Sequence, residues 1–259
     1  MAPAEAACAL CGEGATETGN REMLVTSDAA TSSVGHTMPG MEDFLTTRFW
    51  WVRHAPVRGD GGRIYGQRDI SCDCSDGFVF DALAQALPKN AVWITSNLVR
   101  TKETAAAIRA AGHPDASAPV ALAEFAEQNL GDWQGLDRAQ FFRDRRPSPS
   151  SYWFNDPGER APNGESFVDL VERTRAGIET TIAAHRGRDV IVVAHGGTIR
   201  AALGVALGLP PSGMLSFMTD NCAITELDLL ERDTDRGWRV MTVNYRPWTG
   251  AVSTGGKLA

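Results

Sequence analysis

Residue types that can do phosphate chemistry follow two strand-like runs of this sequence. Arg53 and His54 come directly after the apolar run Phe49–Val52, and His195 follows the apolar run Val190–Ala194 ("VIVVA"). A guanidinium can grip the non-bridging oxygens of a phosphate in bidentate fashion. A neutral imidazole can attack phosphorus and hold the phosphoryl group covalently. An Arg-His pair at the end of a buried strand therefore indicates a nucleophile that is fixed by a rigid element.

A second arginine and an acidic loop follow two further strand-like runs. Arg100 lies in the first turn of the helix expected after Ala91–Thr95 ("AVWIT"), and the loop "AEFAEQNLGDWQG" follows Val120–Leu122. The carboxyl ends of parallel strands form the ligand site in α/β sheets, so we expect these groups to converge. A carboxylic acid there can protonate a departing alkoxide and then activate water. Arginines can neutralise the charge that develops, so no metal or other cofactor is expected.

The spacing of apolar residues predicts the elements that position these groups. Continuous apolar runs of four or five residues suit strands that are covered on both faces, and two later runs, Ala223–Leu229 and Trp238–Asn244, extend the set. Helical spacing appears between the runs, at Leu98–Gly112, Gly164–His185 and Thr198–Pro210. Strands that alternate with helices predict an α/β domain with a largely parallel sheet.

The composition divides the chain into one domain and two tails. Residues 1–45 lack a sustained apolar period, which predicts a poorly ordered N-terminal extension. Residues 46–248 carry all the strand and helix patterns, and residues 249–259 form a predicted flexible tail. Cys8 and Cys11 form a CxxC pair without two further ligands nearby, so we expect free thiols rather than a zinc site.

Charge and hydropathy exclude several classes of partner. The net charge of −7 argues against binding to nucleic acid or to anionic membranes, since both need a positive surface. No apolar run approaches the ~20 residues of a membrane span. The N-terminus has neither a basic stretch nor an apolar core typical of a secretory signal, and the five scattered cysteines do not form a disulfide framework. We therefore expect a cytoplasmic protein. A homodimer is one assembly that the sequence allows.

Several segments in a fixed order resemble the histidine phosphatase superfamily, which has the phosphoglycerate-mutase-like fold. The first departs from the family pattern Arg-His-Gly in having Ala55 in place of the glycine. The resemblance implies a three-layer sandwich, with a central, mostly parallel sheet flanked by helices. It also implies a phosphohistidine intermediate. The segments are "RHAP" at 53–56, "SNLVRTKETA" at 96–105, "EQNLGDWQG" at 127–135, "NGESF" at 163–167 and "AHGG" at 194–197.

The resemblance also implies a role for each matching residue. His54 matches the nucleophile, and Arg53 and Arg100 match the arginines that grip the phosphate. His195 matches the second histidine, which holds the transferring phosphoryl group. Glu127 matches the proton donor, because it lies four residues before the glycine of its segment.

Four more residues carry weaker expectations. Glu124 is out of register with the acidic motif and is interpreted as a surface charge. Arg58 lies where the family often places a further phosphate-contacting residue, although a solvated loop arginine is the alternative. Gly66 matches a family glycine in the loop beside the substrate. Gly196, which opens the helix after the second histidine, is expected to bind substrate through its backbone.

Three activities fit this resemblance: a phosphomonoesterase for a small phosphorylated metabolite, a phosphoglycerate-type mutase, and an inactive phosphate-binding module. Mutases carry Arg and Tyr after the acidic residue, whereas Gln128, Asn129 and Leu130 follow Glu127 here, which favours hydrolysis. The segments "GRIYGQRD" and "GDWQG" are similar to the α-ribazole-phosphate phosphatase branch, so α-ribazole 5'-phosphate is a candidate substrate.

The aromatic and arginine-rich segment Phe141–Gly164 is interpreted as a lid that selects the leaving group.

Overall fold

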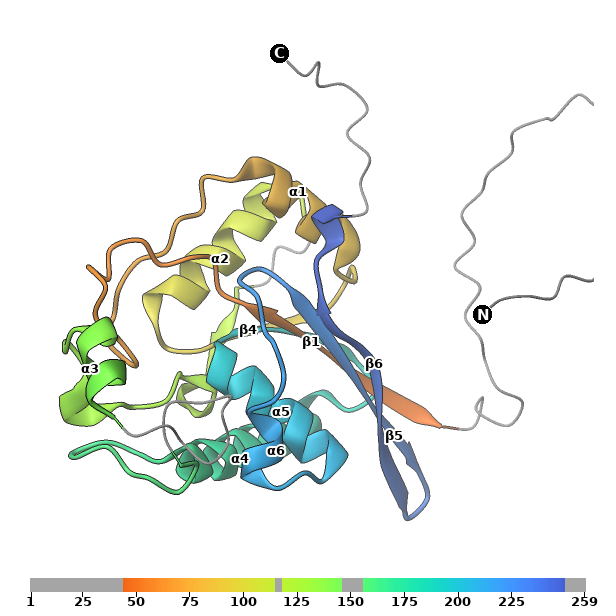
Figure 1. Ribbon diagram of the computed structural model, residues 1–259. Helices are drawn as coiled ribbons and strands as arrows, with labels where there is room; N and C mark the ends of the chain where they lie inside the picture. Colours follow the sequence, from red (N-terminus) through yellow and green to blue (C-terminus); the bar gives the residue numbers. More distant parts are fainter. Residues whose placement is uncertain (1–43, 115–117, 146–155, 250–259) are drawn as a thin grey trace, which may run out of the picture. The chain divides into compact units, whose positions relative to one another are not determined.

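The computed structural model describes residues 44–114, 118–145 and 156–249 (Figure 1). Nearly all of the predicted N-terminal extension, with Cys8 and Cys11, lies outside the described residues. The same holds for residues 250–259 and for the middle of the predicted lid, residues 146–155. No helix in the described ranges is long and apolar enough to cross a membrane.

A six-stranded sheet forms the centre of the described region, in the order β3-β2-β4-β1-β5-β6. Strands β3, β2, β4 and β1 run parallel to one another, whereas β5 is antiparallel to both β1 and β6. The predicted mostly parallel sheet is therefore confirmed. The strands are β1 (Leu45–Arg53), β2 (Val92–Thr95), β3 (Val120–Ala121), β4 (Asp189–Ala194), β5 (Ile224–Arg232) and β6 (Asp235–Tyr245).

Helices cover both faces of this sheet, which makes the three-layer sandwich that was predicted (Figure 1). On β4, Val190 and Val192 belong to the core cluster that includes α4 and α5, while Ile191 and Val193 belong to the cluster with α1 and α2. Since successive side chains of a strand point to opposite faces, a continuous apolar run is needed to fill both clusters. The helices are α1 (Gly77–Ala86), α2 (Val99–Ala110), α3 (Arg138–Asp144), α4 (Phe167–His185), α5 (Gly196–Leu207) and α6 (Pro211–Met214), with 3₁₀ turns at Ala123–Phe125, Gly131–Trp133 and Pro247–Thr249.

Local signals mark where helices begin, and three helices, α1, α3 and α6, were not predicted. Helix α4 starts three residues after Gly164, because Ser166 and Asp169 form a capping box. Helix α1 begins after the capping residue Asp76 and buries Phe80, Leu83 and Ala84 at helical spacing, so the sequence carried a signal for this helix that was missed. Helix α3 buries none of its residues and so has no apolar pattern to detect.

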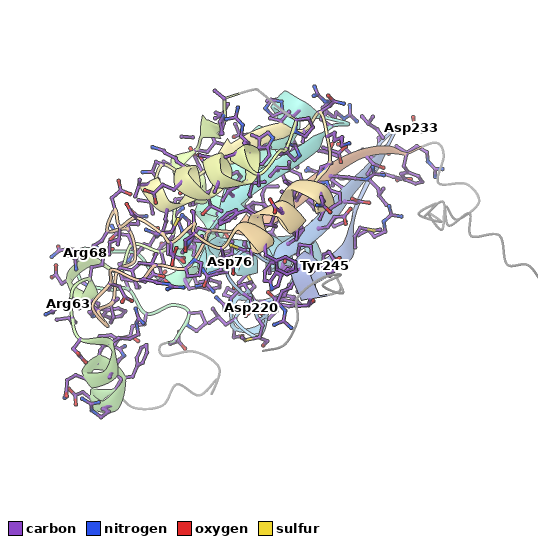
Figure 2. All side chains as sticks on the ribbon, turned by 90° about the horizontal axis from the view of Figure 1, so that it is seen from above. Arg63, Arg68, Asp76, Asp220, Asp233 and Tyr245 are labelled. Carbon is purple, nitrogen blue, oxygen red and sulfur yellow. The ribbon has the colours of Figure 1, made fainter. Side chains whose placement is uncertain are left out.

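The strand register brings the predicted chemistry together. Arg53 pairs with Ala194 across the parallel β1 and β4, so His54 and His195 follow at the same edge of the sheet. The His54 amide donates to the Ala194 carbonyl at 3.0 Å. Figure 2 shows the loop of Arg63 and Arg68 at one end of the domain, opposite the hairpin turn at Asp233 that joins β5 to β6.

Candidate active site

His54 lies in a turn that determines which ring nitrogen carries the proton. Its Nδ1 lies 2.7 Å from the Ala55 carbonyl oxygen. A carbonyl oxygen only accepts hydrogen bonds, so Nδ1–H is the donor and the lone pair of the neutral ring is on Nε2. The turn is held by the Ala55 amide, which donates to Thr104 Oγ1 of α2 at 2.9 Å. His54 therefore offers Nε2 as a nucleophile.

His195 has the opposite tautomer. Arg100 Nε–H donates to its Nδ1 at 3.3 Å, and a guanidinium cannot accept in return. The proton is therefore on Nε2, which donates to Ser96 Oγ at 2.8 Å. The rings of His54 and His195 lie side by side, with their centroids 5.1 Å apart. Arg100 and Ser96 thus fix both the tautomer and the plane of the second imidazole.

Arg100 is itself held by the loop that contains Gly66. Its Nη2 donates to the Gly66 carbonyl at 2.7 Å and its Nη1 to the Arg68 carbonyl at 3.0 Å. Gly66 has φ +45°, and a Cβ there would lie 2.5 Å from Gln134 Oε1 and 2.9 Å from the Gln128 carbonyl. Only glycine fits this position without displacing its neighbours.

Both imidazoles are kept neutral at pH 7. Burial lowers the pKa of His54 well below its ordinary value, and the charges of Arg100 and Arg53 lower it further. Burial, Arg100 and His54 do the same to the pKa of His195. For His54, burial is a larger cause of the neutral form than the charge of either arginine.

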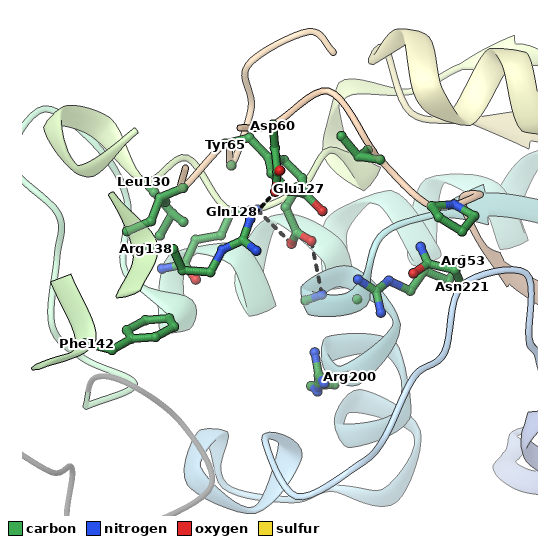
Figure 3. Close-up of a pocket in the computed structure, with 16 residues that line it drawn as sticks. Arg53, Asp60, Tyr65, Glu127, Gln128, Leu130, Arg138, Phe142, Arg200 and Asn221 are labelled. Carbon is green, nitrogen blue, oxygen red and sulfur yellow. Dashed lines mark hydrogen bonds and ion pairs between the residues drawn. The ribbon is translucent and has the colours of Figure 1, made fainter. Parts of the chain in front are cut away.

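A pocket of about 400 Å³ opens beside this cluster (Figure 3). This volume suits a small metabolite rather than a macromolecule. Four of the residues predicted for the site line the pocket: Arg53, Gly66, Glu127 and Gly196. His54, His195 and Arg100 are not among its lining residues, and each is at most 1% exposed.

Glu127 faces the start of α5, next to the second histidine. Its Oε2 accepts from the Gly197 amide at 3.5 Å, and its Oε1 accepts from the Gln128 amide at 3.0 Å. A Cβ at position 197 would clash with Glu127 Oε1, so the carboxylate approaches this closely only because residue 197 is glycine. Glu124, by contrast, is exposed on the surface and does not line the pocket.

Arg58 lies away from the pocket. Its guanidinium pairs with Asp73 at 2.7 Å, and 79% of its side chain is exposed. It is absent from the pocket lining, so its position agrees with the alternative of a solvated loop arginine.

Arg200 and Asn221 are among the pocket residues that were not predicted from the sequence. Arg200 lies on α5 one turn after Gly196, and its Nε donates to the Phe217 carbonyl at 2.8 Å. Burial lowers the pKa of Arg200 to about 10, so it stays charged at neutral pH. The i, i+4 spacing from Gly196 could have indicated it. Asn221, whose Nδ2 donates to the His54 carbonyl at 2.7 Å, lies in a loop that carries no periodic signal.

The fold and the cluster together are typical of enzymes that act on phosphate esters, with neutral histidines and arginines at the carboxyl ends of parallel strands. The chain belongs to the histidine phosphatase superfamily (branch 1), whose family model matches residues 49–245. Its phosphatase relatives identify it as a phosphoric monoester hydrolase.

Three known proteins illustrate the relationship. A glucosyl-3-phosphoglycerate phosphatase of Mycolicibacterium vanbaalenii is 30% identical over 174 residues, which cover 63% of this chain and 75% of the relative. A probable phosphoglycerate mutase of Yersinia enterocolitica is 27% identical over 184 residues, which cover 70% of this chain and 84% of the relative. The solved structure of a mycobacterial glucosyl-3-phosphoglycerate phosphatase in complex with VO3 superposes with a TM-score of 0.64 at 26% identity, over 76% of this chain and 98% of that chain.

Proposed function

We propose that the protein is a metal-independent phosphomonoesterase that hydrolyses a small phosphorylated metabolite through a phosphohistidine on His54. The observation that carries this proposal is the tautomer of His54. Its Nδ1–H donates to the Ala55 carbonyl, so the lone pair of Nε2 is available in a neutral ring that feels the charges of Arg53 and Arg100.

The proposed reaction has two steps. In the first, Nε2 of His54 attacks phosphorus, the bond from phosphorus to the ester oxygen breaks, and the departing alkoxide takes a proton from the carboxylic acid of Glu127. In the second, the Glu127 carboxylate takes a proton from water, and the hydroxide attacks phosphorus. The bond from phosphorus to nitrogen then breaks, and its electron pair returns to Nε2. The products are the alcohol and inorganic phosphate.

The arginines supply the charge that a metal ion supplies in other phosphatases. Arg53 and Arg100 are permanently cationic and lie beside the two imidazoles, where negative charge develops on the phosphoryl oxygens. His195 carries its proton on Nε2 and is proposed to hold the phosphoryl group during transfer, which requires this N–H to turn from Ser96 Oγ to a phosphoryl oxygen.

The outer part of the pocket is proposed to bind the leaving group. Asp60 and Arg138 form an ion pair there, next to Tyr65, and Phe142 of α3 forms an apolar wall (Figure 3). Polar groups beside an aromatic wall suit a hydroxyl-rich ring. Two candidates follow: a sugar-linked phosphoglycerate, by analogy with the mycobacterial relatives, and α-ribazole 5'-phosphate, from the sequence resemblance.

The test is turnover of a panel that contains p-nitrophenyl phosphate, both candidate esters and 3-phosphoglycerate, with and without EDTA. We expect inorganic phosphate to be released with EDTA present, and His54→Ala to abolish turnover while the circular dichroism spectrum is unchanged. Substantial activity in the folded variant, or loss of activity on chelation, would contradict the mechanism. Isomerisation of phosphoglycerate without phosphate release would identify a mutase. Phosphate binding without turnover of any ester would identify an inactive module.

The remaining expectations stay predictions. They are a cytoplasmic location, a small phosphorylated molecule as the only class of ligand, and a homodimer as a candidate assembly.

A further inference from the structure

Three polar groups from different elements surround one point above Gly196. A Cβ at this position would lie 3.1 Å from Arg200 Nη1, 3.2 Å from Thr219 Oγ1 and 3.5 Å from Arg53 Nε. Arg53 ends β1, Arg200 belongs to α5, and Thr219 lies in the loop before β5. We call this space, with its three polar groups, the Gly196 cradle. The three groups approach the backbone of residue 196 this closely because it has no side chain.

Two of the three groups lack a hydrogen-bond partner within the described part of the chain. Arg53 Nε and Thr219 Oγ1 are both buried and unpaired there. Thr219 is only 4% exposed. A buried polar atom without a partner costs folding free energy, and native proteins retain few of them, most often where a ligand or function requires it.

Hydrogen bonds to backbone carbonyls hold both arginines of the cradle in place. Arg53 Nη1 donates to the Thr219 carbonyl at 2.6 Å, and Arg200 Nε donates to the Phe217 carbonyl at 2.8 Å. The same loop is tied to the turn of His54 through Asn221. These bonds fix the loop and both guanidinium groups, so the cradle has a defined shape before any ligand arrives.

The chemistry of the cradle selects an oxyanion. Arg53 Nε and Arg200 Nη1 only donate hydrogen bonds, and the Thr219 hydroxyl can donate as well, so the ligand must accept. Two guanidinium charges and the positive end of the α5 dipole favour a negative ligand. A substrate offers such oxygens either on its phosphoryl group or on an acidic group of its leaving portion.

The position of the cradle favours the phosphoryl group. Arg53 directly precedes His54, Gly196 directly follows His195, and the charge of Arg53 lowers the pKa of both imidazoles, so the cradle lies near them. We propose that Arg200 and Thr219 bind substrate and that, with Arg53, they hold non-bridging oxygens of the transferred phosphoryl group above Gly196. This inference rests on the proposed phosphatase function and adds two residues to its phosphate site.

Inorganic phosphate is the probe that tests the cradle directly, because its binding requires no turnover. Titration calorimetry should show at least about tenfold weaker binding for Thr219→Val and for Arg200→Gln, since each removes a hydrogen bond to an anion. Thr219→Ser keeps the hydroxyl and should bind phosphate like the wild type. Arg186→Gln removes an arginine that pairs with Glu231 on the surface, and should have no effect.

A third variant tests the space itself. Gly196→Ala would place a methyl group against all three polar groups and should also weaken phosphate binding, even if the other variants were too unstable to purify. For each folded variant, kcat/KM for p-nitrophenyl phosphate should fall with the phosphate affinity, because this ester has no second anionic group.

Two results would overturn the inference. One is wild-type phosphate affinity in folded Thr219→Val and Arg200→Gln. The other is a loss of kcat/KM in these variants that is confined to substrates with an additional acidic group. That result would mean that the cradle binds the leaving portion of the substrate. A wild-type enzyme that binds phosphate but hydrolyses no ester would contradict the proposed function and would still leave the phosphate affinities to decide the cradle.

Discussion

The two active-site histidines are chemically different because each has a different neighbour at Nδ1. The Ala55 carbonyl accepts from His54, whereas Arg100 donates to His195. The first ring therefore has a nucleophilic Nε2, and the second has a protonated Nε2. The same residue type is thus present as two different tautomers, set by the backbone at His54 and by Arg100 at His195, and the proposed mechanism gives each ring a different task.

A first prediction at this scale concerns pH and stability. Burial lowers the pKa of His54 and His195 in the folded protein well below the ordinary value. In the unfolded chain the pKa of both rings is about 6.5. Below that pH the unfolded state binds protons that the folded state does not. The free energy of unfolding should therefore decrease as the pH falls below about 6.5, by up to about 1.4 kcal/mol per pH unit for each ring.

Urea unfolding at a series of pH values measures this slope. His54→Gln should lose part of the wild-type slope, because one of the two buried rings is gone. His185→Gln, at the end of α4 and outside the pocket, serves as the control and should keep it. An unchanged slope in the His54 variant would show that its ring is not held neutral by the fold.

A second prediction separates the two acidic residues of the same loop. Glu127→Gln should lower kcat/KM for an alkyl phosphate by roughly 10²-fold or more, because the alkoxide loses its proton donor. The loss should be smaller for p-nitrophenyl phosphate, whose leaving group needs little protonation. Glu124→Gln should have no effect, since this residue is exposed. The reverse pattern would place the proton donor three residues earlier.

At the scale of elements, the loop that carries Gly66 sets the position of Arg100. Gly61→Ala and Gly66→Ala both introduce a side chain at positive φ, but only at Gly66 does the new Cβ meet other atoms. The change at Gly61 should cost about 1–2 kcal/mol of stability and leave kcat/KM unchanged.

The change at Gly66 should be more destabilising and should lower kcat/KM on the order of 10²-fold, because it displaces an arginine that orients His195. Chemical denaturation of the two variants measures the cost of backbone strain, and steady-state kinetics measures the effect of displacing Arg100. Equal activity in both variants would mean that the loop does not position Arg100.

The elements also explain how far the sequence could predict the site. The strands and the helices α2, α4 and α5 have apolar residues at regular spacing, so their residues at the strand ends were found. Thr219 and Asn221 belong to a loop whose place depends on hydrogen bonds from Arg53 and to the His54 carbonyl. Such contacts join residues far apart in the sequence and have no period, so no pattern along the chain indicates them.

At the scale of the whole molecule, the family match begins at residue 49 and the site residues lie between Arg53 and Asn221. A chain that lacks residues 1–40 should therefore keep its melting temperature and its kcat/KM within error. Thermal unfolding and steady-state kinetics of the truncated and full-length proteins measure this. A drop of several degrees, or a clear loss of activity, would show that these residues contribute to the domain or to the site.

The place of β1 in the sheet has a consequence for how the enzyme fails under stress. His54 follows a strand that is hydrogen-bonded on both sides, to β4 and β5, whereas α3, which supplies part of the outer pocket wall, buries none of its residues. Local opening should therefore begin at α3, and the amide of His54 should be among the last to exchange its hydrogen with solvent. Mild denaturant would then erode discrimination between leaving groups while p-nitrophenyl phosphate is still hydrolysed, so selectivity would be lost before chemistry.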